Sequence, residues 1–281
     1  MKTHLFKLFG VLGLFFLISK AANSQHVFVE GSVYIANDEN VEILDSLTLG
    51  TGSDLYIEDT ANIIFYGGNF KMEPSAKIFG VNPGLPLTPV QGNGTGVITF
   101  FRNPLGPLPL EGQTLDCGNS SDPANSSQNT LTSIVINNPA GVKLINSDAR
   151  IGTNLSFVNG HIITDDNDLT LGPAATITAA DAAKFVVTNA TGRLIKENTN
   201  TTPFIFPVGF EEGSFNPLSV TQNQQSEDIG VRCKLHALRD GLTGPPLVKD
   251  VVDASWVITE SVVGQNDLTL TAEWTNGDEP L

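Results

Sequence analysis

The sequence predicts an all-β protein, a right-handed parallel β-helix (solenoid) followed by a partial antiparallel β-sandwich. Three observations support this prediction. Short runs of Val, Ile, Leu and Phe recur about every eight residues, turn-forming Gly, Asn, Asp and Ser separate them, and no longer segment carries a helical apolar stripe. The 281 residues include 27 Gly and 16 Pro, which suits a chain that turns often.

The N-terminal segment 1–24 reads as a removable signal peptide. Lys2 and Lys7 precede an apolar run over 8–18, and small residues at 21–24 offer a cleavage site. The apolar run is shorter than the roughly 20 residues of a membrane-spanning helix. We therefore expect a chain that is secreted or displayed on the bacterial cell surface, with no membrane insertion after signal removal.

Acidic residues dominate the charge. The chain has 30 Asp and Glu against 15 Lys and Arg, a net charge of −15, and the signal peptide would take Lys2, Lys7 and Lys20 away with it. Nucleic-acid binding rests on Lys and Arg contacts to phosphates. The composition therefore excludes nucleic acid and anionic membranes as expected partners and leaves divalent cations open.

The predicted β-helix repeat domain covers 25–197. Its first strand candidates are Val27–Val29, Val33–Ile35, Val41–Leu44, Leu47–Leu49, Leu55–Ile57, Ile63–Tyr66 and Lys77–Phe79. Further candidates are Ser133–Ile136, Val142–Ile145, Leu155–Val158, His161–Thr164, Leu169–Leu171, Ala175–Thr178, Lys184–Thr188 and Arg193–Lys196. The words at 47–50 and 169–172 are both Leu-Thr-Leu-Gly, and such repetition is typical of a solenoid.

Stacking explains why such short strands would form a solenoid. One coil of about 20 residues cannot bury its apolar face, whereas stacked coils share a core and pair their backbones. An antiparallel sandwich also has strands at short regular spacing and remains the alternative. Strands of three or four residues are short for a sandwich, which favours the solenoid.

An irregular insertion is expected at 81–130. It contains Pro83, Pro86, Pro89, Pro104, Pro107, Pro109 and Pro123, which exclude long interior strands. Only Gly96–Phe101 resembles a strand, and the small polar residues of 118–129 indicate a loop. This loop would be either a solvated insertion or a cover over a binding face.

The strand candidates lengthen after a polar linker at 198–203, so 198–281 is predicted as a β-sandwich-like domain. Its strands are Phe204–Val208, Phe215–Thr221, Ile229–His236, Ala254–Thr259 and Leu268–Trp274. Trp256 and Trp274 are the expected core aromatics. Five strands make a thin sandwich, and we expect this domain to be truncated.

Several phrases resemble repeats of large secreted surface proteins of Bacteroidota. The phrases are Ser133–Leu144, Leu155–Thr164, Asp168–Gly172, Phe185–Leu194, Phe206–Gly209 and Phe215–Leu218, within Leu131–Trp274. The resemblance implies an adhesin-like β-helix cargo of the type IX secretion system. Such cargo usually ends in a small C-terminal sorting domain, which the residues after Trp274 do not supply. This departure also points to truncation and leaves the final address open.

The sequence offers no catalytic constellation. His26, His161 and His236 lie far apart, each in or beside a strand candidate, and no Gly-x-Ser-x-Gly motif accompanies them. A Ser-His-Asp site stays open on sequence alone, but we expect a protein that is not an enzyme.

One acidic cluster could hold calcium. Asp165, Asp166 and Asp168 offer the oxygen ligands that calcium prefers. The same residues lie between two strand candidates, where Asp and Asn favour a turn without any metal. Apart from this calcium candidate, no cofactor is expected.

Two covalent modifications are also candidates. Cys117 and Cys233 could form a disulfide in an oxidising compartment, or they could be two buried thiols. Ser46 and Thr60 resemble the Asp-Ser/Thr-aliphatic O-glycosylation sites of exported proteins in this bacterial group. Both also fit ordinary turns.

We expect a non-catalytic cell-surface or extracellular-matrix protein with an adhesive or structural role, as a spacer or a binding module. Its candidate partners are a surface polysaccharide or a host or matrix protein. The alternative is a secreted β-helix protein that binds or degrades polysaccharide. That alternative needs converging acids, a basic residue and exposed aromatics, and the basic candidates between 81 and 197 are Arg102, Lys143, Arg150, Lys184, Arg193 and Lys196.

Overall fold

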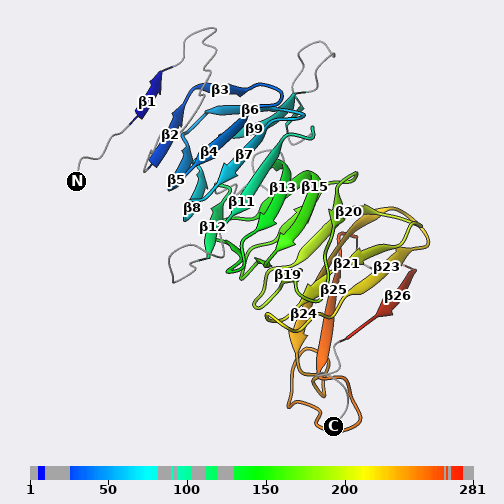
Figure 1. Ribbon diagram of the computed structural model, residues 1–281. Coiled ribbons are helices and arrows are strands. Elements are labelled where there is room, and N and C mark those ends of the chain that lie inside the picture. Colours follow the sequence, from blue (N-terminus) through cyan, green and yellow to red (C-terminus); the bar gives the residue numbers. More distant parts are fainter. Residues whose placement is uncertain are drawn as a thin grey trace.

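The computed structural model describes residues 6–9, 26–81, 90–91, 94–102, 112–118, 130–262, 264 and 267–274. These residues form 26 strands and no helix. The strands build a β-solenoid of about seven turns, which stack along one axis into an elongated body (Figure 1). The predicted all-β solenoid is therefore confirmed.

Four sheets contain the strands. Sheet A has the order β1 (Phe6–Phe9), β2 (His26–Glu30), β5 (Ser46–Leu49), β8 (Asn69–Met72), β12 (Gln113–Asp116), β14 (Val142–Leu144), β16 (Ile162–Ile163), β19 (Val186–Val187), β22 (Val208–Gly209). Sheet B has the order β10 (Val90–Gln91), β9 (Lys77–Val81), β6 (Asp54–Glu58), β3 (Ser32–Ile35). Sheet A is parallel throughout, and in sheet B only β10 runs antiparallel.

Sheet C has the order β25 (Ala254–Glu260), β24 (Glu227–Leu235), β20 (Leu194–Thr199), β17 (Leu169–Leu171), β15 (Ala149–Asn159), β13 (Thr130–Asn137), β11 (Val97–Phe101), β7 (Asn62–Phe65), β4 (Asn40–Ile43). β18 (Thr176–Thr178) also pairs with β15. Sheet D is small and antiparallel, in the order β21 (Phe204–Phe206), β23 (Leu218–Gln222), β26 (Leu268–Ala272).

Each early coil contributes one strand to sheet A, then one to sheet B, then one to sheet C. The first coil, for example, is β2, β3 and β4. Corresponding residues in sheet A are 20 positions apart where Val142 pairs with Ile162. In the later coils sheet C forms two sides of the coil. The long strand β15 pairs with β17 through Ala149–Ile151 and with β18 through Asn154–Ser156.

The core consists of apolar ladders that run from coil to coil. One ladder in sheet C joins Ile63, Ile98, Ile134 and Leu155, all fully buried. Beside it, Phe65 and Phe100 pack edge to face with ring centroids 5.6 Å apart. Because burial of such a side chain contributes about 2 kcal/mol, neighbouring coils stabilise one another.

Two buried side-chain amides form hydrogen bonds with both of their N–H groups. The Gln113 side-chain amide donates to the carbonyls of Phe65 (2.9 Å) and Gly67 (2.7 Å) in an earlier coil. The Asn138 amide donates to Gln113 Oε1 (3.1 Å) and to the carbonyl of Gly141 (2.9 Å). These bonds satisfy polar groups at the corner of three coils, which would otherwise be costly to bury.

The two identical Leu-Thr-Leu-Gly words do not occupy equivalent positions. Residues 47–49 lie in sheet A as β5, whereas 169–171 lie in sheet C as β17. Both words end in the same turn, because the N–H groups of Ser53 and Ala175 donate to the carbonyls of Gly50 (3.0 Å) and Gly172 (2.9 Å). The Leu-Thr-Leu-Gly motif therefore forms a strand followed by a turn, and this combination occurs on more than one side of the coil.

The expected insertion at 81–130 is partly regular. β11 matches the Gly96–Phe101 candidate and pairs in parallel with β7 and β13. β12 was not expected, yet it pairs in parallel with β8 and β14 as a regular member of sheet A. Two regular strands of the stack, β11 and β12, thus lie in this segment, and 82–89, 92–93, 103–111 and 119–129 lie outside the described residues.

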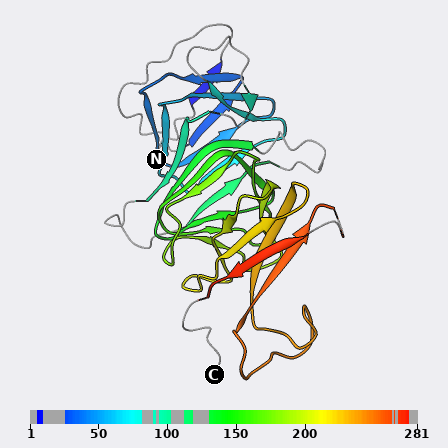
Figure 2. The same cartoon turned by 90° about the vertical axis from the view of Figure 1, so that its right-hand side faces the viewer.

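The expected boundary between 197 and 198 falls inside a strand. β20 runs to Thr199 and pairs on one side with β17 and on the other with β24. β24 and β25 therefore extend sheet C in antiparallel fashion at one end of the stack (Figure 2). Val220 and Val231 belong to the same buried cluster as the solenoid core, so the predicted partial antiparallel sandwich is present as a small addition that packs on the end of the solenoid.

Of the two tryptophans expected in the core, Trp256 lies against it and Trp274 does not. Trp256 packs against the core, and its indole Nε1 donates to the carbonyl of Asn216 (2.8 Å). Trp274 is 44% exposed and is not a core aromatic, because it follows the edge strand β26. The described residues contain no helix long and apolar enough to cross a membrane.

Candidate binding surfaces

The three histidines lie apart, each with its own local partner. His161 is buried, its Nδ1 accepts from the Phe185 N–H (3.4 Å), and its ring packs edge to face on Phe185. His236 Nδ1 lies 2.8 Å from Asp253 Oδ1, and His26 contacts Ser46 Oγ. Burial lowers the pKa of His161, which keeps its imidazole neutral.

The carboxylates of the acidic cluster contact the coils on either side and do not converge on a common centre. Asp165 accepts from Asn189 Nδ2 (2.9 Å) and pairs with Lys143, while Asp166 accepts from Thr191 Oγ1 (2.8 Å). Asp165 also has a positive φ of 49°, as a turn residue would.

The third carboxylate of the cluster, Asp168, is held by Arg193. Nη2 of Arg193 lies 2.5 Å and Nε 3.1 Å from the two oxygens of Asp168. The part of the chain that the structure describes contains no group of three or more His, Cys, Asp or Glu side chains placed to hold a metal ion. The turn interpretation of Asp165, Asp166 and Asp168 therefore fits the geometry, and the calcium site does not.

Cys117 and Cys233 are both buried and form no disulfide with each other, so the candidate disulfide is absent. Cys117 follows β12, whereas the N–H of Cys233 bonds to Thr188 Oγ1 (2.9 Å) directly after β19. β12 and β19 are three ladder steps apart in sheet A, or about 14 Å. A disulfide needs Cα atoms within about 7 Å. Burial raises the pKa of Cys117 far above its usual range, which leaves this thiol unreactive.

The two O-glycosylation candidates make contacts between the first coils. Thr60 is exposed, and its hydroxyl donates to Asn37 Oδ1 (3.1 Å) and accepts from the Asp38 N–H (2.8 Å). Ser46 is partly exposed beside His26. Both hydroxyls thus take part in coil-to-coil bonding, and their modification stays a prediction.

Other charged side chains also act as ties between coils. Arg150 binds Glu197 through two bonds, Nε to Oε1 (2.7 Å) and Nη2 to Oε2 (2.6 Å). Lys196 is buried, and its ammonium donates to the carbonyls of Gly172 and Pro173, both at 2.7 Å. Burial lowers the pKa of Lys196.

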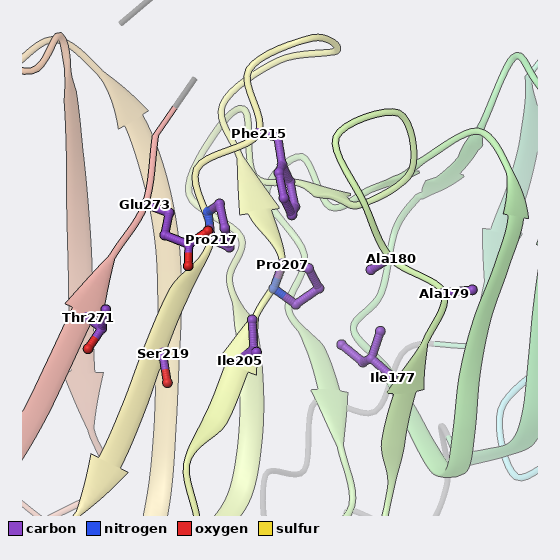
Figure 3. Close-up of a pocket in the computed structure, with 10 residues that line it drawn as sticks. All are labelled: Ile177, Ala179, Ala180, Ile205, Pro207, Phe215, Pro217, Ser219, Thr271 and Glu273. Carbon is purple, nitrogen blue, oxygen red and sulfur yellow. The ribbon is translucent and has the colours of Figure 1, made fainter. Parts of the chain in front are cut away.

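A groove of about 310 Å³ lies where the solenoid meets sheet D (Figure 3). Ile177, Ala179 and Ala180 form the solenoid side, and Ile205, Ser219, Thr271 and Glu273 form the sheet D side. Figure 3 shows Pro207 and Phe215 between these two sides. Ile205 is 60% exposed, so the groove presents apolar surface together with two hydroxyls and one carboxylate.

The groove marks the place where the side branch of sheet C that leads from β15 to β18 stops. Ile177 follows Leu155 in the buried ladder, but nothing in the ladder covers it, and it is only partly buried. The next coil places β21 at this position along the chain, yet β21 pairs with β23 and not with β18. Pro203 and Pro207 flank β21 and lack the N–H groups that a longer strand would use.

A second surface feature is an aromatic ladder on sheet B. Tyr34, Tyr56 and Phe79 are in register, and the rings of Tyr56 and Phe79 stack at 4.9 Å. Tyr34 ends the ladder and is 41% exposed. Partial burial and then its contact with Glu58 raise the pKa of Tyr34 to about 12, so its hydroxyl stays protonated.

Acidic and basic side chains flank the same ladder. Asp54 and Glu58 lie on the face of β6 that carries Tyr56, and Lys77 is in register with Asp54 on the next strand. Sheet B thus places aromatic rings, two acids and one base on one outward face.

Sequence reasoning found neither surface. The phrase Phe215–Leu218 supported the resemblance, but no signal placed it opposite Ile177, which is far away in the chain. The tyrosines could have been found from the alternation in Val33–Ile35 and Leu55–Ile57, which turns Tyr34 and Tyr56 outward. Comparison with protein-family models, with curated proteins and with solved structures finds no match.

Proposed function

We propose that the chain is an exported, non-catalytic protein of the cell surface or extracellular matrix, with an adhesive or spacer role. The observation that carries the proposal is the use of its charged side chains. Arg193–Asp168, Arg150–Glu197 and Lys143–Asp165 each tie one coil to another. Charges used in this way stiffen a rod, which suits a spacer that holds a binding surface away from the cell.

The N-terminal sequence supports export, since 1–24 has the order of basic, apolar and small residues of a signal peptide. β1 lies inside this segment and pairs with β2. Cleavage before Gln25 would remove β1 and leave every other strand in place.

Gene deletion with two complementations tests the proposal. The unaltered chain should restore attachment and biofilm formation, whereas a chain without 2–24 should restore neither and stay inside the cell. N-terminal sequencing of the exported protein should begin at Gln25. Attachment and biofilm that are unchanged by the deletion would refute the role, and an exported protein that retains Lys2 and Lys7 would refute the signal peptide.

The second candidate function is polysaccharide binding, and the aromatic ladder of sheet B favours it. Sugars pack on aromatic rings, and their hydroxyls donate to carboxylates such as Asp54 and Glu58. A panel of neutral and cationic polysaccharides should then bind the unaltered protein and bind the Tyr34→Ala variant at least about 10-fold more weakly. The Trp274→Ala variant serves as the control, because Trp274 has similar exposure elsewhere. Equal binding by both variants would exclude this site.

A further inference from the structure

The groove between β18 and sheet D has an unused strand edge along one side. Within the described residues β18 pairs only with β15, through Asn154–Ser156, so its other edge has no strand partner. Among the described residues, the backbone hydrogen bonds of the turns and loops do not reach Thr176–Thr178 either. Unpaired backbone groups on a strand edge are a template for another strand.

The apolar ladder gives the same position a second unused surface. Ile63, Ile98, Ile134 and Leu155 are each covered by the next residue of the ladder, whereas Ile177 is not. An aliphatic side chain placed one strand spacing beyond Ile177, about 4.8 Å away, would complete the ladder. Ile205 would then contact it from the sheet D side, and Phe215 lines the groove between the two sides.

The outer face of β18 sets the chemistry of the flanking positions. The Thr176 hydroxyl donates to Asn154 Oδ1 (2.9 Å), and Thr178 accepts from Asn154 Nδ2 (3.4 Å), so this face carries a polar ladder. A strand added beside β18 would therefore alternate polar, aliphatic and polar residues. Glu273 lines the groove, and the whole chain carries a net charge of −15, so the added strand should be basic.

We infer that this groove binds an extended polypeptide segment of a partner protein, which adds to β18 as a further strand and inserts an aliphatic side chain between Ile177 and Ile205. Backbone hydrogen bonds to β18 provide affinity, and the apolar pocket and Glu273 provide selectivity for a basic segment with alternating polarity. The inference deepens the proposed adhesive role, because it names the chemistry of the partner.

A synthetic peptide tests this mode of binding directly. The probe is acetyl-Thr-Lys-Thr-Ile-Thr-Lys-Thr-amide with a fluorescent label, titrated with the purified full chain and followed by fluorescence anisotropy. Two further probes carry N-methyl groups, one on the second, fourth and sixth residues and the other on the third, fifth and seventh. A strand on one edge uses only alternate N–H groups, so one methylated probe should bind at least about 10-fold more weakly and the other should bind nearly as well as the parent.

Two variants locate the binding. Ile205→Ser, on the wall of the groove, should weaken binding of the parent probe at least about 10-fold. Leu44→Ser is the matched control, because Leu44 is also an exposed aliphatic residue but lies in the first coil. Hydrogen exchange should show slower exchange of the β18 amides when the parent probe is bound.

The inference is overturned by the absence of saturable binding, by equal effects of the two methylated probes, or by unchanged binding to the Ile205→Ser variant. Binding of neutral oligosaccharides that is lost in Ile205→Ser, with no peptide binding, would also overturn it. Peptide binding is measured on the isolated protein, so it can succeed even if gene deletion leaves attachment unchanged. Peptide binding together with unchanged attachment after gene deletion would refute the adhesive role and leave the peptide-binding groove in place.

Discussion

At the scale of single residues, polar side chains in this protein mainly join one coil to the next. Arg193 is the clearest case, because it bonds Asp168 in the preceding coil and also donates from Nη1 to Thr259 Oγ1 (3.0 Å) in β25. It therefore ties the solenoid to its antiparallel end. The sequence showed these residues to be charged but not which of them would meet.

Removal of this tie should destabilise the fold measurably. We expect Arg193→Ala to lower the free energy of unfolding by about 1–2 kcal/mol, because Asp168 loses its partner while partly buried. Urea denaturation followed by circular dichroism measures the change. Lys184→Ala is the control, because Lys184 pairs with Asp181 three residues away in the same turn and its loss should cost less than about 0.5 kcal/mol. Equal losses in the two variants would contradict the assignment of Arg193 as a tie.

Buried His161 should make stability depend on pH. Its pKa is lowered in the folded state, so below pH about 6.5 the unfolded chain takes up a proton that the folded chain does not. Stability that is present above this pH is therefore lost as the pH falls from about 6.5 towards the folded pKa. Nearby Glu212 opposes this shift in part. Urea denaturation at pH 7.5 and 5.5 should show the loss in the unaltered chain and a smaller loss in His161→Gln. The same loss in both proteins would rule out His161 as its source.

At the scale of strands, a strand was predictable from sequence where apolar residues alternate and was missed where buried polar residues replace them. β12 has only one apolar residue, Leu115. β8 was also missed, although Phe70 and Met72 alternate in it, because its first residue follows Gly67 and Gly68 and reads as part of a turn. In β12 the buried residues include Gln113 and Asp116, whose bonding partners come from other coils. Propensity read along one segment cannot detect partners that are about 30 to 50 residues away.

Corners between strands depend on close approach of neighbouring coils. A Cβ atom on Gly67 would lie 1.0 Å from the carbonyl oxygen of Asp45, whereas a Cβ on Gly68 would meet nothing within 4 Å. We expect Gly67→Ala to lower the free energy of unfolding by about 3 kcal/mol or more, because the backbone of one coil must move. The adjacent variant Gly68→Ala should change stability by less than about 1 kcal/mol. Thermal denaturation of both variants gives the comparison, and a similar midpoint for the two would contradict this packing.

At the scale of the whole molecule, stacking was predictable but the place where stacking ends was not. The sequence placed a domain boundary after Glu197 because the strands lengthen there. The structure continues sheet C through that point, since β24 pairs with β20 and β25 with β24. Longer strands indicated a change from parallel to antiparallel pairing within one sheet. The candidate groove lies beside β18, and its walls come from segments far apart in the chain, which explains why local sequence did not reveal it.

A chain that ends after Glu197 should therefore fold poorly. The cut divides β20, and it exposes both the edge of this strand and the buried side chain of Leu194. We expect it to aggregate on size-exclusion chromatography at concentrations where the full chain elutes as a single species. A chain that ends after Trp274 is the control, because it keeps every described strand. A soluble 26–197 fragment that unfolds cooperatively would contradict this expectation and support a domain boundary after Glu197.

The hydrogen bonds that join the coils run along the length of the rod, which has a mechanical consequence. A pulling force on the two ends acts along these bonds, so the interfaces between coils open one after another and are not sheared together. Each coil that opens releases about 20 residues, or roughly 65 Å of slack chain. Under tension the molecule would lengthen in steps and dissipate load gradually, and the Arg193 tie to β25 would delay opening from the C-terminal end.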